Sequence, residues 1–582
     1  MTTIDDIGKA LHGFVQAVCS WDSNGYLRRT NDGPANATTG TRSADLRTLN
    51  DLLEECARGM TQLHCVRDTV SAELNSSTPV DGLPDEILAL IFEHHDAGAR
   101  YFGHYDESPI HPTVVVASVC ARWRAVALAY PALWSCLDLN TPRAHLGYLS
   151  ERTRGYPLSL YYDHAILLGP TQLDVYLQLN AVAKFIEANL GRTRFLKVEG
   201  LADPADDHHK EVVDALFHTQ APSLTEFKIS SDCEFPLARP LFGGHAPHLR
   251  RVTVSGLDIT WSPGLFSNLS SLAIKGGSIT FLPGTDLCDI IRSLPGLESL
   301  CLQRLLFSES QTQSCTRRME LARLQTLTLN LPASVVSHIL SSFELPTLRS
   351  MSLTPRMVHE RGHGPTEIPP LCDPGMLPRT LLETITRLHI TFTEKIGYFR
   401  NVSLHTLLNG HSSDGTLAFS LSCYFADIIG GIDAFRMAWK LAKRLKAHYF
   451  AASMPILVLE SSFDRTEHPL IVFLERLPGA VSLVLKGLDD ASILSATFIR
   501  ELSPSDLSAL RKLTLQRLEL NEDGLHALSA CFRKLDGRLE TLVAEDVRLV
   551  ASDEVVKNAL DGWGSVVARV DVRSFTIVPP SK

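Results

Sequence analysis

Two kinds of apolar pattern divide this chain, and the first lies between Leu83 and Trp134. Apolar residues recur there at helical spacing in two segments, so each segment predicts an amphipathic helix. Pro84 falls in the first turn of the first helix, where a missing N–H costs nothing, and Asp85 and Glu86 follow at the positive end of the helix dipole. The first apolar stripe consists of Ile87, Leu88, Ile91 and Phe92, and the second of Val116, Val119, Cys120, Trp123, Val126 and Ala127.

The two stripes belong to a small helical module of about 50 residues. Arg122 and Arg124 are expected to face water on the far side of the second helix. A module of this size buries little core of its own, so its apolar faces need a partner or a neighbouring domain.

The order of these residues resembles that of an F-box, and especially that of the F-box-like domains abundant in mushroom-forming fungi. The resemblance rests on Leu-Pro-x-Glu-Ile-Leu-x-x-Ile-Phe at 83–92, Val-Cys-x-x-Trp-Arg-x-x-Ala at 119–127 and Pro-x-Leu-Trp at 131–134. It implies a three-helix F-box-like domain over 81–138, interrupted by a polar loop from Glu93 to Pro112 that is longer than in compact F-boxes. An ordinary helical hairpin is the alternative.

The resemblance also implies a partner and a surface. F-box proteins dock on the adaptor Skp1 and through it on a cullin–RING ubiquitin ligase, in which they act as substrate receptors. The residues implied to form or support the Skp1-facing surface are Leu83, Pro84, Ile87, Leu88, Ile91, Val119, Cys120, Trp123 and Trp134. Some of them are expected to hold the module together instead, and Trp123 suits either role.

The residues before this module predict a flexible segment over 1–45, which can hold a short helix, and then a heptad-like helix over 46–78. The heptad series is Leu49, Leu53, Cys56, Met60, Leu63, Val70 and Leu74, with Arg67 interrupting it. Steps of three and four residues over fewer than four heptads suit a helix packed on one partner. We favour a helix folded back on its own F-box-like domain over dimerisation.

The second kind of apolar pattern is a repeated phrase that fills residues 139–578. It reads Leu, two residues, an apolar residue, one residue and another apolar residue. Copies lie at 224–229, 249–254, 269–274, 297–302, 324–329, 348–353, 385–390, 481–485, 510–515 and 539–542. The spacing of roughly 20 to 28 residues is the period of leucine-rich repeats.

Each phrase predicts a short strand whose alternate residues point inward, and apolar residues between the phrases predict helices at 286–291 and 335–340. Stacked units of this kind bury a continuous core. The predicted fold class is therefore α/β: short N-terminal helices and a helical F-box, followed by a leucine-rich-repeat-like α/β solenoid with a parallel strand sheet. The repeat asparagine is missing, so the repeats are degenerate, and a generic parallel α/β domain is the alternative.

Between Ile390 and Ala480 the period is poorly kept, although 417–421 and 456–459 can be strands. On the other strands, polar residues alternate with the inward-facing ones and are expected to bind a protein target. These candidate target-binding residues are Lys228, Thr253, Lys275, Gln303, Asn330, His389 and Lys486. The lysines favour an acidic or phosphorylated target.

Composition narrows the classes of function. The net charge of −10 over 582 residues argues against nucleic acid as the main partner. No apolar run reaches 18 residues and no signal peptide is present, so no membrane partner is expected. The 12 cysteines form no Cys-x-x-Cys pair, which fits a reducing compartment and predicts a cytoplasmic or nuclear protein.

Several motifs are expected to carry no chemistry. His359-Glu360-Arg361-Gly362-His363 matches a zinc-protease signature, but prolines and glycines surround it, so a loop is expected instead of a helix. The basic segment 435–446 predicts a helix with a solvated face. His208 and His209 predict a polar loop. We therefore expect no enzyme activity, no cofactor and no metal.

Two hypotheses for function remain. The first is the substrate-recognition subunit of a Skp1–cullin–F-box ubiquitin ligase, whose repeat domain holds an unknown protein target. The second is a repeat-based interaction scaffold with no role in ubiquitin transfer.

Overall fold

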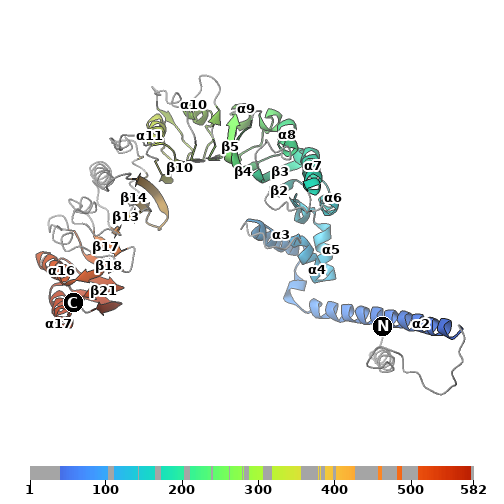
Figure 1. Ribbon diagram of the computed structural model, residues 1–582, viewed down its shortest axis with the longest axis horizontal. Helices are drawn as coiled ribbons and strands as arrows, with labels where there is room; N and C mark the ends of the chain where they lie inside the picture. Colours follow the sequence, from blue (N-terminus) through green and yellow to red (C-terminus); the bar gives the residue numbers. More distant parts are fainter. Residues whose placement is uncertain are drawn as a thin grey trace, which may run out of the picture. The chain divides into compact units, whose positions relative to one another are not determined.

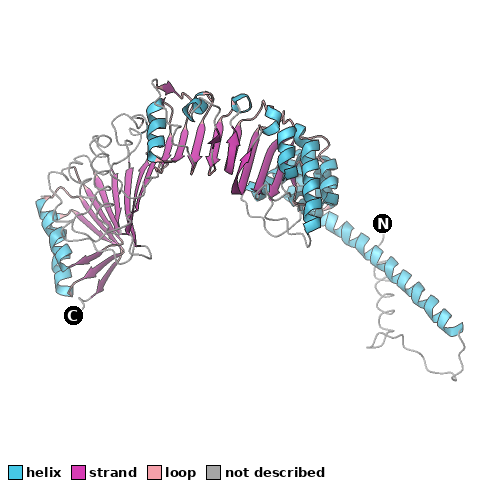
Figure 2. Ribbon diagram, turned by 45° about the horizontal axis from the view of Figure 1, so that its top comes forward, coloured by secondary structure: helices cyan, strands magenta, loops and turns pink. Residues whose placement is uncertain are grey.

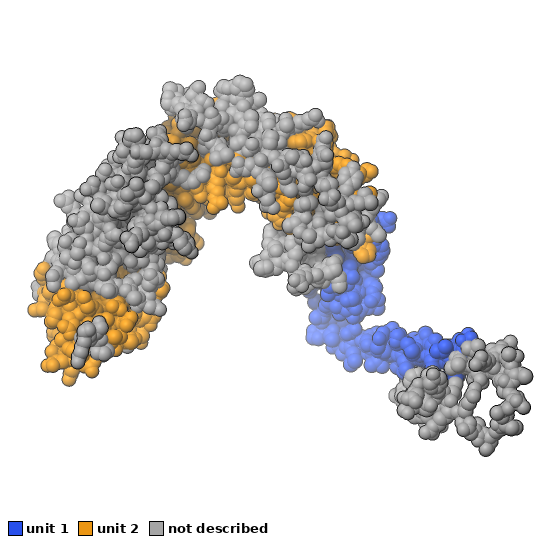
Figure 3. Space-filling model, viewed as in Figure 1, with its two compact units in different colours: residues 1–136, 147–156 blue, residues 137–146, 157–582 orange. Residues whose placement is uncertain are grey.

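A computed structural model of the chain forms two compact units (Figures 1 and 3). Unit 1 comprises residues 1–136 and 147–156, and unit 2 comprises residues 137–146 and 157–582. The structure describes residues 40–101, 111–141, 143–163, 172–201, 210–237, 240–260, 263–277, 279–280, 287–305, 318–355, 378, 381, 387–396, 402–426, 456–461, 481–487, 509–535 and 537–578.

The main elements of unit 1 are all helices. They are α2 (Gly40–Ser76), η1 (Pro79–Gly82), α3 (Asp85–Tyr101), α4 (Pro112–Val119), α5 (Ala121–Ala129) and η2 (Pro131–Trp134). Asp85 and Glu86 lie in the first turn of α3, as the dipole argument predicts, while Pro84 directly precedes that helix.

One expectation for this module is wrong. Residues 93–101, predicted as the start of a long loop, continue α3 for more than two turns. The second apolar stripe is carried by two helices, α4 and α5, because Cys120 adopts an extended backbone (φ −153°, ψ 171°) between them; with α3 they make the three helices that the resemblance implies. The Cys120 Sγ accepts a hydrogen bond from the Trp123 amide at 3.4 Å, so this residue caps α5.

The heptad-like helix is present, but it is not folded back on the module. Leu53, Met60, Leu63, Val70 and Leu74 of α2 are all exposed. Among the described elements, α2 makes extended contact only with η1, just beyond its own C-terminal end. The favoured fold-back interpretation is therefore wrong for the described residues. The predicted segment 1–45 lies mostly outside them.

The strands of unit 2 alternate at first with helices. The first half contains β1 (Cys136–Asp138), α6 (Arg143–Arg152), β2 (Leu158–Asp163), α7 (Gln172–Asn189), η4 (Leu190–Arg192), β3 (Thr193–Leu201), α8 (Lys210–His218), β4 (Glu226–Leu237), η5 (Leu241–Gly244), β5 (Arg251–Thr260), α9 (Pro263–Phe266), β6 (Ser271–Lys275), β7 (Ile279–Thr280), α10 (Leu287–Arg292) and β8 (Ser299–Gln303). Of these, β1 and α6 cross the boundary between the units. The predicted helix at 286–291 is confirmed as α10.

The second half contains β9 (Met319–Glu320), β10 (Thr326–Asn330), α11 (Ala333–Ser342), β11 (Phe343–Glu344), β12 (Ser350–Leu353), β13 (Arg387–Ile396), β14 (Val402–His411), β15 (Leu417–Ala426), β16 (Ile456–Ser461), β17 (Ser482–Gly487), β18 (Lys512–Gln516), β19 (Glu519–Asn521), α16 (Glu522–Lys534), β20 (Thr541–Glu545), β21 (Val547–Val550), α17 (Asp553–Val566), β22 (Arg569–Val572) and β23 (Phe575–Val578). The predicted helix at 335–340 and the strands at 417–421 and 456–459 are confirmed.

Most of these strands join one large sheet dominated by parallel pairs. In the described residues, the order runs β1, β2, β3, β4, β5, β6, β8, β10, β12, β15, β14, β13, β16, β17, β18, β20 and β22, with β7 beside β5. Strand β14 is antiparallel to both of its neighbours, β13 and β15. These three strands enter the sheet in reverse order, and this reversal explains why the repeat period fails after Ile390.

The repeated phrases meet in register. Phe227 pairs with Val252, which pairs with Leu272, and the row continues through Leu300, Leu327 and Met351, all of them buried. A second row two residues further along contains Ile229, Val254, Ile274, Leu302, Leu329 and Leu353. Because side chains alternate along a strand, the two apolar residues at the end of each phrase point to the same side of the sheet. Neighbouring strands therefore contribute these residues to one shared core. Helices α7, α8, α10 and α11 lie along one face of this sheet (Figure 2).

A residue with a left-handed backbone conformation recurs after the five-residue paired segment of several strands. These residues, each with φ between 53° and 70°, are Gly256, Gly276, Arg304, Arg517 and Asp546. At Gly256 the reason is steric, because an added Cβ would lie 2.2 Å from the carbonyl oxygen of Ser231. The same backbone turn therefore follows strands that lie far apart in the sequence.

A helix long and apolar enough to span a bilayer is not found among the residues that the structure describes.

Candidate functional site

The helical module of unit 1 has a closed core. Leu88 and Phe92, one helical turn apart on α3, are buried, and the Phe92 ring packs 4.9 Å from that of Trp123. Trp134 is 2% exposed, and its indole N–H donates to the Ala127 carbonyl at 2.7 Å. A buried tryptophan with a satisfied N–H fixes the packing of η2 against α5.

The same helices carry apolar side chains that this core does not use. They are Ile87 (42% exposed), Leu90 (55%) and Ile91 (47%) on α3, and Val114 (41%), Val115 (50%) and Val119 (58%) on α4. The two helices pack on each other, and we refer to these six residues as the α3–α4 apolar surface. Exposed aliphatic side chains in such number are typical of a surface that binds a partner.

The nine residues implied for Skp1 contact differ in how far they are exposed to solvent. Pro84, Ile87, Ile91 and Val119 are exposed, whereas Leu83, Cys120 and Trp123 are half-buried. Leu88 and Trp134 are buried in the module, so they support the surface from beneath and offer a partner no side-chain contact.

Sequence reasoning missed Leu90, Val114 and Val115. The signal was present, because three successive valines at 114–116 turn through about 100° per residue and cannot all face one core. Only Val116 is buried. An apolar run wider than a single stripe therefore predicts a second apolar face.

A second candidate site lies on the sheet of unit 2, on the strand residues that alternate with the buried rows. We call these residues, from Tyr161 in β2 to Gln516 in β18, the polar sheet face. The register brings Lys228 beside Thr253, and it places Lys275, Gln303 and Asn330 on three successive strands. Lys486 lies between Glu460 and Gln516, far along the sheet. The predicted target-binding residues therefore fall into separate groups.

His389 has a described backbone, on β13 opposite Asn409 and Val458, but its side chain lies outside the described residues. The zinc-protease-like sequence at 359–363, the histidines at 208 and 209 and the basic segment 435–446 also lie outside them.

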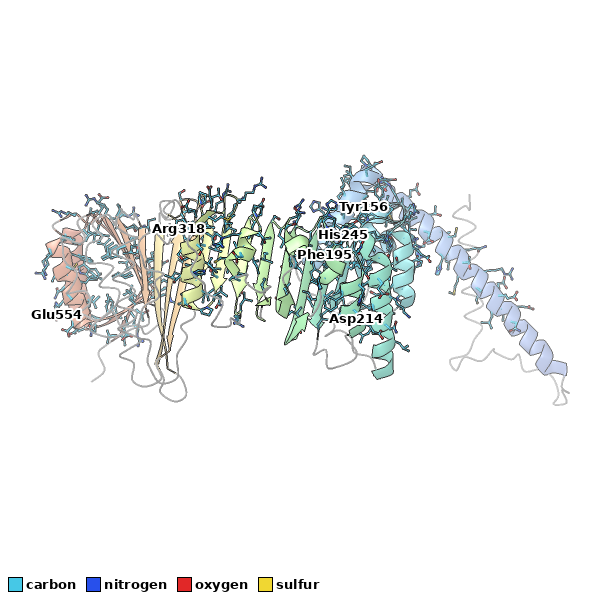
Figure 4. The ribbon with its side chains drawn as sticks, turned by 90° about the horizontal axis from the view of Figure 1, so that it is seen from above. Tyr156, Phe195, Asp214, His245, Arg318 and Glu554 are labelled. Carbon is cyan, nitrogen blue, oxygen red and sulfur yellow. The ribbon has the colours of Figure 1, made fainter. Side chains whose placement is uncertain are left out.

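Charges at the β3–β5 end of the polar sheet face compensate one another. Figure 4 labels Phe195, which lies on β3 at this end. Glu226 pairs with Lys228 at 2.9 Å and with Arg251 at 2.6 Å, and Lys228 also lies 5.4 Å from the centre of the Phe195 ring. Burial raises the pKa of the Glu226 carboxyl, but the two cations outweigh that effect and the net pKa is lowered. Lys228 therefore gives little support to the prediction of an acidic target.

The middle of the polar sheet face carries hydroxyl groups instead of ion pairs. Ser271, Ser299, Thr326 and Ser350 are neighbours across four strands, and Thr326 donates to Ser299 at 2.7 Å. The Asn330 Oδ1 atom, at the other end of its strand, is buried and accepts no hydrogen bond from the described residues. The serine and threonine hydroxyl groups suit contact with a polar protein surface, whereas the buried Asn330 Oδ1 does not reach one.

Comparison with known proteins adds no assignment: no family model matches the chain, and no curated protein matches it.

Proposed function

We propose that unit 1 is an F-box-like module that docks on Skp1 through the α3–α4 apolar surface. One observation carries the proposal: six aliphatic residues stay exposed on two helices whose other faces already close a core around Leu88, Phe92 and Trp134. The order of residues from Leu83 to Trp134, which resembles an F-box, supports it independently.

The energetics favour an obligate partner for this surface. Fully burying an aliphatic side chain is worth roughly 1.5–3 kcal/mol, so six residues that are about half exposed leave several kcal/mol available for binding. Part of that sum is offset by the lost freedom of the two bound molecules.

We propose further that unit 2 is a leucine-rich-repeat-like solenoid that binds a protein target. Parallel in-register rows, the recurring left-handed turn and the strand starts at Lys512, Thr541 and Arg569, roughly 28 residues apart, support this finer description. The chain would present its target to a ligase partner, which performs the catalysis.

Co-expression with Skp1 tests the docking. Wild type is expected to co-purify with Skp1 in a one-to-one ratio, and an Ile87→Glu, Ile91→Glu variant is expected to lose at least nine-tenths of it, because two charges would enter the apolar contact. Leu177→Glu is the control, since Leu177 is an aliphatic residue on α7 of unit 2 that is more exposed (58%) than Ile87 or Ile91. Equal loss in the control, or full retention in the double variant, would contradict the proposal.

The alternative is an interaction scaffold without a role in ubiquitin transfer. The scaffold account allows binding to Skp1 or self-association, but only the ligase account predicts that a cullin joins a complex with Skp1. Addition of purified cullin to the Skp1 complex, followed by size-exclusion chromatography, separates them.

A further inference from the structure

Arg122 lies where the sequence does not place it. It is expected to face water on α5, yet its side chain is only 31% exposed and reaches the junction between η1 and α3. Arg124, two residues later on the same helix, is exposed and donates to the Ala117 carbonyl at 3.0 Å.

The guanidinium group of Arg122 contacts three alternate residues of that junction. Its Nη1 donates to the carbonyl of Asp81 and, at 3.0 Å, to the Asp81 carboxylate. Its Nη2 donates to the Leu83 carbonyl and, at 2.8 Å, to the Asp85 carboxylate, which also accepts from Nε at 3.2 Å. The two carboxylates raise the pKa of Arg122 further, so the group stays charged.

These contacts fix the backbone of the junction. Leu83, which has an extended backbone (φ −75°, ψ 144°), links η1 to α3, and its carbonyl is held by Arg122. Pro84, the next residue, is exposed. The Pro84 carbonyl then accepts the first bonds of α3, from the amides of Ile87 and Leu88, both at 3.1 Å.

We infer that Arg122 is a positioning residue for the docking surface: it holds the Leu83–Pro84 segment and the first turn of α3 in the orientation that Skp1 binds. It acts through Leu83 and Pro84 and makes no contact with the partner that the inference requires. The role rests on the proposed function, but the geometry it describes exists in the free chain. A planar fork serves four acceptor oxygens on three residues here, so lysine, with one point charge, is not an adequate replacement.

A double-mutant cycle separates positioning from general stability. Arg122→Gln is expected to weaken Skp1 binding at least tenfold, and Arg122→Lys by nearly as much. In a Leu83→Ala, Pro84→Ala background, Arg122→Gln should add less than a further twofold, because the segment it positions is already altered. In a Val115→Ala background it should keep its full effect, since Val115 lies on α4. Arg124→Gln is the matched control and should change affinity less than twofold.

Hydrogen exchange of the free chain tests the positioning role of Arg122 without any partner. In Arg122→Gln, the amides of Ile87 and Leu88 should exchange at least tenfold faster than in wild type, while those of α4 stay unchanged. If wild type does not bind Skp1 and this local effect is present, the docking proposal fails and the structural role stands. Unchanged exchange at Ile87 and Leu88, or full additivity with the Leu83→Ala, Pro84→Ala change, would overturn the inference.

Discussion

The α3–α4 apolar surface and the polar sheet face differ in how they meet water. On the first, six aliphatic residues of α3 and α4 are exposed. On the second, charged groups pair within the face, as Glu226 does with Lys228 and Arg251, and hydroxyl groups fill the middle strands. Covering the first surface with a partner lowers the free energy, because apolar area leaves water. The second surface can stay in water at little cost, because its polar groups are already paired or hydrated.

This difference suggests a division of labour. A surface that is costly to leave exposed suits a constant partner, whereas a compensated polar face suits a target that binds and leaves. Affinity at the first should come from buried apolar area and at the second from matched hydrogen bonds and charges. Mutations should therefore act differently in the two regions.

The largest contrast is expected within α3. Leu88→Ala, in the closed core, should lower the free energy of unfolding of unit 1 by about 2–5 kcal/mol, because it leaves a cavity. Ile91→Ala, nearly one turn away on the exposed side, should change it by less than about 0.5 kcal/mol. Chemical denaturation followed by tryptophan fluorescence measures both. Similar losses would show that the exposed side also belongs to a core.

In unit 2 the strongest effect should come from the backbone. Gly256→Ala should lower the free energy of unfolding by about 1–3 kcal/mol or more, because the new Cβ would clash with the Ser231 carbonyl and φ is +69°. Arg304→Gly, at the equivalent turn after β8, should be neutral or stabilising, since it relieves a left-handed backbone. Thermal unfolding of the two variants checks the pair. A mild Gly256→Ala and a harmful Arg304→Gly would contradict the shared turn.

The smallest expected effect concerns charge on the polar sheet face. The pKa of Glu226 is lowered by folding, so its contribution to stability is fully present above the unfolded value of about 4.5 and is lost as the pH falls through the lower folded value. Wild type should therefore lose more stability than Glu226→Gln between pH 6 and pH 3. Parallel urea titrations of both proteins give this difference. An identical pH dependence would mean that the ion pairs contribute nothing.

Local pattern was sufficient for much of the fold. The phrase spacing predicted parallel strands at 224–229, 249–254 and later copies, and the register confirms rows such as Phe227, Val252 and Leu272. Two-residue periodicity specifies which side chains face inward without any knowledge of the neighbours. The reversed order of β13, β14 and β15 could not be predicted, because strand order depends on long-range pairing.

The candidate docking surface was predicted in part for the same reason. Helical spacing placed Ile87, Leu88, Ile91 and Phe92 on one stripe, but only the packed module shows that Leu88 and Phe92 face the core while Ile87 and Ile91 do not. Arg122 was misplaced because the Asp81, Leu83 and Asp85 groups that attract it lie about 40 residues earlier in the chain. Side chains held by distant partners leave no periodic signal.

Hydrogen exchange of the whole chain with and without purified Skp1 tests the docking claim most directly. Bound Skp1 should slow exchange in peptides covering 83–94 and 112–119 by at least tenfold and leave peptides from β4 to β8 unchanged, because only the α3–α4 apolar surface is covered. Protection confined to the sheet, or no protection at saturating Skp1, would contradict the assignment of that surface.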